Sequence, residues 1–302
     1  MELEYRKSMT IRELRRRLVL LLRSWRQSQR ADNQPAGERL RELLQRLGIA
    51  KDYVVDMNAF DGVWRDCSIN LFSNGWRGLL VESDRDKFAR LAFVFTEFPS
   101  ANLARLQVTP ENVLALLETY RVPKDLPFLN FGIVSFDAPV MSTILQAGYR
   151  PKLISMKINE KLPPPLFFAV DFYEGHYWIH DHFYACSLTA AASIVKPHGY
   201  VLDCLEYNDV VFVRKDLAAG IAADHSVEDA YDSGYRNRPD RAARFPHNAD
   251  VDCALTATPE ENVRFFTELF KAYQGHFTLE ILSPQSYEQI SYLKRIRESL
   301  PG

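Results

Sequence analysis

Between residues 53 and 214, short apolar runs alternate with amphipathic stretches, which is the pattern of alternating strands and helices. The apolar runs of strand length lie at 53–57, 79–82, 103–108, 126–134, 152–158, 200–205 and 210–214. The stretches between them predict helices at 66–74, 84–95, 139–148 and 187–196, and a further helix that opens at Thr109-Pro110. We therefore predict an α/β fold with a doubly wound, seven-stranded sheet, whose last two strands form an antiparallel pair.

The residues before position 51 have a different pattern. Residues 1–30 contain nine Arg or Lys against three Glu, and their apolar residues recur at helical spacing. The pattern predicts a basic amphipathic helix, for which three roles stay open: packing on the α/β domain or on a second subunit, a lid over a cofactor site, or contact with a membrane surface or nucleic acid. A second helix over 40–47 is expected to end at Gly48.

The residues after Asp216 differ again. Residues 223–250 are rich in Asp, Arg, Asn, Pro and Gly, which predicts a long loop that is ordered only by a ligand or partner. Thr258 and Glu261 have capping-box spacing and predict a helix to about Tyr273, followed by a strand at 277–282 and a helix at 284–299. The expected division is 1–50 for the N-terminal basic helices, 51–217 for the α/β domain, and 218–302 for a loop and C-terminal helical appendix.

Composition narrows the function class. The 302 residues are 47% hydrophobic, which suffices for a sizeable core, and the net charge of −2 does not indicate a nucleic-acid partner. Four scattered cysteines are typical of free thiols in a reducing compartment. No apolar run approaches the ~20 residues of a membrane span, and the first residues lack the apolar core of a signal peptide. We expect a cytoplasmic protein.

Carboxylates end the first two predicted strands. The first strand ends at Asp56-Met57 and is followed by a polar turn over Asn58–Gly62, while the second ends at Glu82. The carboxyl ends of parallel strands form the usual ligand crevice of an open α/β sheet. A carboxylate at the end of the second strand can accept hydrogen bonds from both ribose hydroxyls of a nucleoside. The pattern predicts a nucleoside site at this edge.

These stretches resemble a known family. Residues 54–62, followed by Asn-Gly-Trp-Arg-Gly-Leu-Leu-Val-Glu at 74–82, are similar to the FkbM-type branch of the class I S-adenosylmethionine (SAM) methyltransferases. The likeness continues more weakly to about Val213. It implies a Rossmann-like methyltransferase sheet with SAM as cofactor, and methyl transfer to a hydroxyl or amine of a small metabolite or glycan. The cofactor-binding residues that it implies are Asp56, Asn58, Asp61, Gly62 and Glu82.

The chain departs from the family pattern after the first predicted strand and in the fourth. Asn58 and Phe60 stand where the family has Gly and Asn, and Gly132 and Val134 stand where relatives often have acids. Methyl transfer is an in-line displacement that depends mainly on alignment and exclusion of water, so these losses permit it but disfavour a carboxylate or metal at this strand. They also leave two alternatives open: a catalytically degenerate protein that serves as a binding or partner subunit, and an enzyme that uses SAM for other chemistry.

Candidate acceptor-site residues lie further along the chain. Three prolines at 163–165 predict an extended loop at the mouth of the site. Three histidines and an aspartate occur within 176–182, for which metal binding, substrate contact and aromatic packing are the alternatives; we expect no metal. The catalytic candidates are Asp137, Lys157 and His182, and the substrate-binding candidates are Asn159, Glu160, Asp181 and Tyr184. An oligomer that forms through the N-terminal helices is a further expectation.

Overall fold

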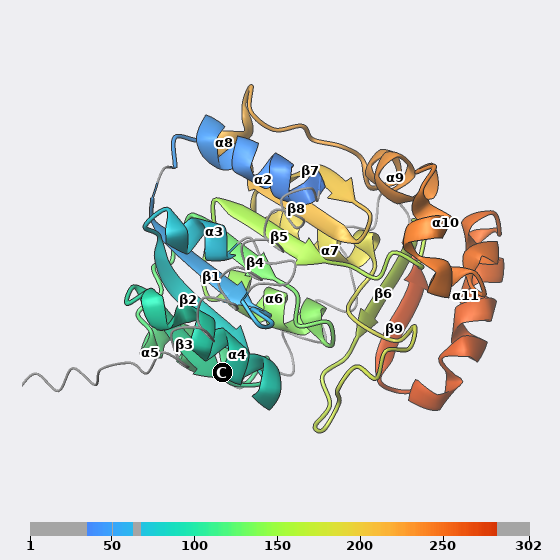
Figure 1. The fold of residues 1–302 in the computed structure, drawn as a ribbon. Coiled ribbons are helices and arrows are strands. Elements are labelled where there is room, and N and C mark those ends of the chain that lie inside the picture. Colours follow the sequence, from blue (N-terminus) through green and yellow to red (C-terminus); the bar gives the residue numbers. More distant parts are fainter. Residues whose placement is uncertain (1–34, 50, 63–67, 283–302) are drawn as a thin grey trace, which may run out of the picture.

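The computed structural model describes residues 35–49, 51–62 and 68–282 (Figure 1). The predicted helices within residues 1–30 and at 284–299 lie outside these ranges. The main sheet has the strand order β3-β2-β1-β4-β5-β8-β7, in which β1 to β5 are parallel and β8 runs antiparallel to both its neighbours. Its strands are β1 (Tyr53–Met57), β2 (Arg77–Glu82), β3 (Ala101–Arg105), β4 (Phe128–Phe131), β5 (Leu153–Lys157), β7 (Tyr200–Glu206) and β8 (Asp209–Arg214). The predicted seven-stranded α/β sheet, with an antiparallel pair formed by its last two strands, is confirmed.

Helices cover both faces of this sheet. One face carries α2 (Pro35–Arg46), α3 (Ser68–Ser73) and α4 (Arg85–Val94), and the other carries α5 (Val113–Thr119), α6 (Asp137–Gln146) and α7 (Leu188–Val195). Successive residues of a strand point to opposite faces, so Val54 packs with the first group and Val55 with the second. The sheet is therefore doubly wound, as predicted.

Local signals explain most helix boundaries. Asp84 caps α4 by accepting hydrogen bonds from the amides of Asp86 and Lys87, and Gly48 follows α2 with a φ of 68°. The Thr109-Pro110 start was wrong: Thr109 and Asn112 hydrogen-bond each other in a turn, and α5 begins at Val113. The fourth strand is shorter than expected because the chain turns at Val134, where φ is 56°.

A second sheet pairs β6 (Leu166–Val170) with β9 (Phe277–Ile281) in antiparallel fashion. The expectation of an extended loop after the three prolines was incomplete, because the residues that follow form β6. All five of its side chains are buried, and Phe168 packs against Phe183 and Phe270. Burial of these aromatic residues explains why the chain forms a strand here.

Residues 223–250 are ordered by their own side chains, so the predicted ligand-dependent loop was wrong. After α8 (Lys215–Ala218), this segment forms α9 (Val227–Tyr231), a π-helical turn η3 (Asp232–Arg236), α10 (Arg241–Arg244) and η4 (Pro246–Asn248). Tyr231 and Tyr235 are buried in the same core as the main sheet. Aromatic anchors therefore outweigh the polar composition of this segment.

The chain then forms η5 (Asp252–Leu255), α11 (Pro259–Leu269) and η6 (Lys271–Tyr273) before β9. The predicted capping box at Thr258 and Glu261 is confirmed, since each side chain bonds the backbone of the other residue. Short 3-10 turns also occur at η1 (Phe95–Glu97) and η2 (Lys196–His198). In Figure 1, α9 lies near β7, and α10 and α11 lie beside β6 and β9.

Candidate functional site

A small cavity of about 60 Å³ lies at the carboxyl ends of β1, β2, β3 and β4. It is lined by Met57, Asn58, Val81, Glu82, Ser83, Leu106, Gln107, Val108, Ile133, Ser135, Phe136, Tyr177 and Trp178. This is the edge where an open parallel sheet binds ligands, because the turns that leave the strands meet there. Tyr177 and Trp178 come from the segment between β6 and α7, and this segment is tied to the turn after β3 by a 2.8 Å hydrogen bond from Gln107 Nε2 to the His176 carbonyl.

Two residues that line this cavity each have a buried polar atom without a hydrogen-bond partner among the described residues. These atoms are Oε2 of Glu82, a residue only 4% exposed, and Oγ of Ser135. The other Glu82 oxygen accepts a 2.8 Å hydrogen bond from the Asp84 amide. Burial raises the pKa of Glu82, and the amides of Asp84 and Phe60 oppose that rise. An unpaired buried carboxylate oxygen is costly, so a ligand that donates hydrogen bonds to Glu82 would remove a penalty.

The other predicted cofactor residues support the turn. Asp56 accepts a 2.6 Å hydrogen bond from Ser68 Oγ and a 3.3 Å bond from the Asn58 amide, which fixes the end of β1. Asp61 lies outside the lining of the small cavity. Asn58 and Glu82 are thus the members of the predicted cofactor set that line it.

Gly62 and Phe60 face helix α4 and its extension. A Cβ at Gly62 would lie 2.7 Å from Phe95 Cε2 and 2.8 Å from Leu91 Cδ1, and its φ is 74°. Close packing and positive φ therefore explain this glycine. The ring of Phe60 lies 4.4 Å from Lys87 Nζ and does not line the small cavity. The Phe60 side chain therefore does not fill the small cavity.

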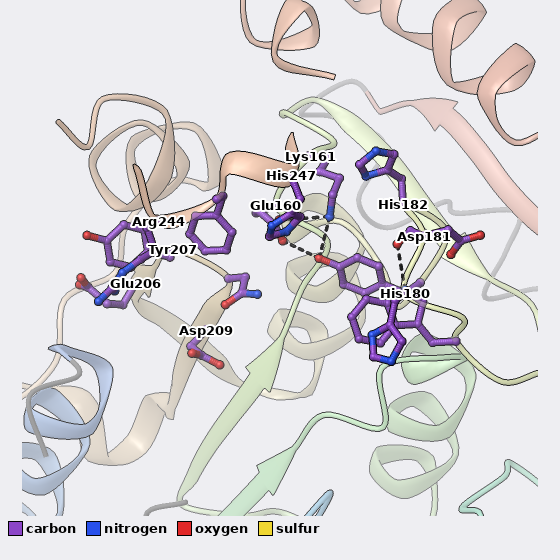
Figure 2. Close-up of a pocket in the computed structure, with 14 residues that line it drawn as sticks. Glu160, Lys161, His180, Asp181, His182, Glu206, Tyr207, Asp209, Arg244 and His247 are labelled. Carbon is purple, nitrogen blue, oxygen red and sulfur yellow. Dashed lines mark hydrogen bonds and ion pairs between the residues drawn. The ribbon is translucent and has the colours of Figure 1, made fainter. Parts of the chain in front are cut away.

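Figure 2 shows a large cavity of about 530 Å³. Trp178 lines both this cavity and the small one. The walls of the large cavity come from the residues after β5, the segment 178–184, the β7–β8 turn and the residues around the end of α10. The lining residues are Glu160, Lys161, Trp178, His180, Asp181, His182, Tyr184, Glu206, Tyr207, Asn208, Asp209, Arg244, Phe245 and His247. Its volume is within the usual range of small-molecule sites, roughly 300–1,000 Å³.

A buried charge network borders this cavity. Lys161 Nζ lies 3.1 Å from Glu160 Oε1 and donates to the Tyr184 hydroxyl at 3.0 Å, and that hydroxyl donates to Glu160 Oε2 at 2.6 Å. Asn248 Nδ2 also donates to Glu160 Oε1, at 2.8 Å. Burial alone would raise the pKa of Glu160, but Lys161, Tyr184 and Asn248 hold it below its usual value. Both oxygens of this carboxylate are therefore occupied, and the network gives the cavity a rigid border.

The predicted acceptor-site residues divide into lining and supporting groups. Glu160, Asp181, His182 and Tyr184 line the large cavity. Asn159 is buried behind it and donates hydrogen bonds to the carbonyls of His182 at 2.9 Å and Tyr184 at 3.1 Å. It therefore orients the segment that carries the lining residues.

The catalytic candidates lie apart from one another. His182 Nε2 lies 3.0 Å from Asp250 Oδ2 at the large cavity. Lys157 lines neither cavity, and its ammonium pairs with Asp209 at 2.6 Å. Asp137 is also outside both linings: it is buried in the first turn of α6 and accepts a 2.7 Å hydrogen bond from the Ser135 amide. The structure brings only His182 of the three to a cavity.

Several lining residues escaped the sequence analysis. Ser135 and Gln107 sit in the turns after β4 and β3, and Tyr207, Arg244 and His247 come from regions interpreted as a turn and a loop. The aromatic residues Tyr231, Tyr235 and Phe245 recur in an otherwise polar segment. They were the available signal that this segment packs against the rest of the chain and could line a cavity. For Ser135, its place directly after a predicted strand was the signal.

The histidine-rich stretch is occupied by local contacts. His176 Nδ1 lies 2.7 Å from the Tyr173 hydroxyl, and His180 packs against Trp178 with ring centroids 4.6 Å apart. Across residues 35–49, 51–62 and 68–282, no group of three or more His, Cys, Asp or Glu side chains is placed to hold a metal ion. No helix within those ranges is long and apolar enough to cross a membrane.

No protein-family model and no curated protein matches this sequence. Solved structures with a similar arrangement include the N-terminal domain of EvdMO1 with SAH bound, at 12% identity and a TM-score of 0.39, covering 60% of this chain and 81% of that one. Monomeric WbdD matches at 15% identity and a TM-score of 0.38, covering 62% and 41%. A TehB-like SAM-dependent methyltransferase from Corynebacterium glutamicum matches at 14% identity and a TM-score of 0.34, covering 64% and 99%.

Proposed function

We propose that this chain is a SAM-dependent methyltransferase of FkbM-like type, which methylates a hydroxyl or amine of a small metabolite or glycan. The observation that carries the proposal is Oε2 of Glu82, which is buried without a hydrogen-bond partner at the end of β2, in a residue that lines the small cavity. In a sheet of this order, that position faces the crevice used by nucleoside ligands. SAM supplies the methyl group on a sulfonium when it is bound.

The residues at the small cavity fit the nucleoside part of SAM. Ribose hydroxyls would donate to Glu82, and Ser135 Oγ offers a second polar contact inside the same cavity. Leu106 and Val108 supply apolar surface beside them for a flat base. Asn58 lines the cavity at the end of β1, where its side chain would meet the rest of the cofactor.

Binding of the whole cofactor requires the segment that carries Tyr177 and Trp178 to move. The small cavity measures about 60 Å³, whereas sites for drug-sized ligands measure roughly 300–1,000 Å³. Tyr177 is 59% exposed, so its displacement disrupts little buried packing. Trp178 is held by a 2.9 Å hydrogen bond from Nε1 to the Asp181 carbonyl, and this bond would have to adjust. Because Trp178 lines both cavities, its movement would join them.

The large cavity is the proposed acceptor site. It shares Trp178 with the small cavity, so an acceptor in it would approach the methyl donor from the adjoining space. The Glu160, Lys161 and Tyr184 network makes one border rigid, which favours a fixed orientation of the acceptor. Alignment and exclusion of water are the main contributions that a protein makes to this displacement.

The size of the small cavity also favours a second candidate, a methyltransferase-fold protein that no longer binds SAM and acts as a binding or partner subunit. Asn58 and the Tyr177–Trp178 cover would then be permanent. In that case the large cavity alone would take a ligand.

Titration calorimetry with SAM and S-adenosylhomocysteine separates the two candidates. The methyltransferase binds both compounds, and Glu82→Ala weakens binding by about 1–3 kcal/mol, roughly 5- to 150-fold, because a charge-assisted acceptor is lost. Glu118→Ala, which removes an exposed carboxylate of α5, is the matched control and should bind as the unmodified chain does. Absence of binding, together with no nucleoside in the purified protein, would favour the partner subunit. Equal affinities for the Glu82 and Glu118 variants would remove Glu82 from the site.

A further inference from the structure

The charged residues on the lining of the large cavity are unequally paired. Its four carboxylates all have close partners: Glu160 with Lys161, Asp181 with the Tyr273 hydroxyl, Glu206 with Arg238, and Asp209 with Lys157. The side chains of Arg244, His180 and His247, in contrast, make no hydrogen bond or ion pair within the described part of the chain. Basic side chains on the lining therefore remain available to a ligand.

Arg244 is held in place by a ring. Its guanidinium carbon lies 4.2 Å from the ring centroid of Tyr207, which is itself buried and donates a 2.5 Å hydrogen bond from its hydroxyl to Asp240. A guanidinium that lies over an aromatic face keeps its N–H groups free at the edge, where they match the two oxygens of a carboxylate or phosphate. Arg244, an exposed residue, is thus positioned by packing on this ring.

Neighbouring acids do not occupy this guanidinium. Burial raises the pKa of Glu206, and the charges of Arg238 and Arg244 oppose that rise, but the direct contact with Glu206 is made by Arg238. Asp240 accepts its hydrogen bond from Tyr207, and Arg241, which comes from the same short helix as Arg244, pairs with Asp252 at 2.5 Å. Among the arginines at 236, 238, 241 and 244, Arg244 is the one without a carboxylate contact in the described residues.

His247 extends the same wall. It lies three residues after Arg244 and packs against Phe245 with ring centroids 5.9 Å apart, and Phe245 in turn lies 5.7 Å from the Tyr207 ring. Figure 2 shows Arg244, Tyr207 and His247 around the cavity, with His180 at another part of its edge. Arg244 and His247 therefore place donors around one aromatic surface.

We propose that the large cavity takes an acceptor that carries an anionic group, a phosphate or a carboxylate, and that Arg244 and His247 bind this group. The large cavity is the acceptor site of the methyl transfer proposed above. That the anionic molecule is a methyl acceptor therefore rests on the proposed function. The aromatic rings of Tyr207, Phe245, Trp178 and Tyr184 would contact the body of the same molecule.

Calorimetric titration of the full chain with three sugars tests this proposal without SAM. Glucose 6-phosphate and glucuronate carry the two anionic groups, and glucose is the neutral reference. We expect at least one charged sugar to bind roughly tenfold or more tightly than glucose, since hydrogen bonds to charged groups have about that value. The tighter of the two charged sugars identifies the preferred anion. The preference should decrease with added salt, because the contact is electrostatic.

Variants locate the binding group. Arg244→Gln should reduce the affinity for the charged sugars to that for glucose. Arg244→Lys keeps the charge but loses the paired N–H groups of the guanidinium, so its affinity for the charged sugars should be intermediate. Arg85→Gln changes the net charge equally on the exposed start of α4 and should have no effect. Thermal unfolding of each variant verifies that it folds.

Three results would overturn the proposal: equal affinity for all three sugars, failure of both charged sugars to bind, or unchanged binding to Arg244→Gln. The test also separates this proposal from the methyltransferase proposal. The Glu82→Ala variant should bind the charged sugars as tightly as the unmodified chain does. If the unmodified chain binds these sugars but not SAM, the anion site is supported and the methyltransferase proposal is contradicted.

Discussion

Asp137 is fully buried at the first turn of α6, where its carboxylate holds the turn that follows β4. The Ser135 amide donates to one oxygen at 2.7 Å and the Val134 amide to the other at 3.3 Å, at a residue whose φ is 56°. Non-glycine residues rarely adopt that conformation, so these bonds stabilise a strained turn. Because Ser135 lines the small cavity, Asp137 acts on the site by positioning its neighbours.

This burial makes stability depend on pH. Desolvation raises the pKa of Asp137 from 3.8 to about 7, against the opposing backbone amides. Between these values the folded chain holds a proton that the unfolded chain has released, so stability should fall as pH rises through this window, by up to about 1.4 kcal/mol per pH unit. Asp137→Asn should remove that slope in urea unfolding between pH 5 and pH 7.

Asp86→Asn is the control for this measurement, since Asp86 is exposed in the first turn of α4. A pH slope in Asp137→Asn equal to that in the control and in the unmodified chain would show that the Asp137 carboxyl does not hold the proton.

At the scale of elements, the strands of the main sheet were the most predictable part of the chain. Their apolar runs are continuous because both faces are covered, and β1 coincides with its predicted range. The positions of the acids Asp56 and Glu82 could be predicted for the same reason, because each lies at the carboxyl end of an apolar strand. The walls of the large cavity could not be predicted, because they depend on which segments meet in space.

The segment after β8 shows why. Its polar residues suggested a loop, yet the hydroxyl of Tyr231 donates a 2.5 Å hydrogen bond to the Glu160 carbonyl, which lies 71 positions earlier in the sequence. Asn248 reaches the side chain of the same residue. Long-range contacts of this kind leave no periodic pattern, so composition alone predicted the wrong structure for residues 223–250.

The Tyr231 contact can be tested. Tyr231→Phe removes the donor and leaves a buried carbonyl without its partner, so we expect a loss of about 1–3 kcal/mol in the free energy of unfolding, measured by urea denaturation. Tyr177→Phe makes the same change on a ring that is 59% exposed and should have little effect. Equal stability of the two variants would mean that the segment is not anchored through this bond.

At the scale of the whole molecule, the small cavity lies at the carboxyl ends of β1 to β4, and the large cavity lies among the β7–β8 turn, residues 178–184 and the residues around the end of α10. The main sheet supplies the turns around the small cavity, and the segment between β6 and α7 supplies Trp178, which both cavities share. The strand pairing of β6 with β9 joins the C-terminal residues to the same core. A single segment, 177–184, therefore contributes lining residues to both cavities.

A crystal structure of the chain soaked or grown with S-adenosylhomocysteine tests the central claim most directly. The account predicts electron density for the nucleoside at the end of β2, with ribose hydroxyls within hydrogen-bond distance of Glu82 Oε2 and with Tyr177 and Trp178 displaced from their present positions. Density absent from this edge, with Tyr177 and Trp178 still covering Glu82 at saturating ligand, would contradict it.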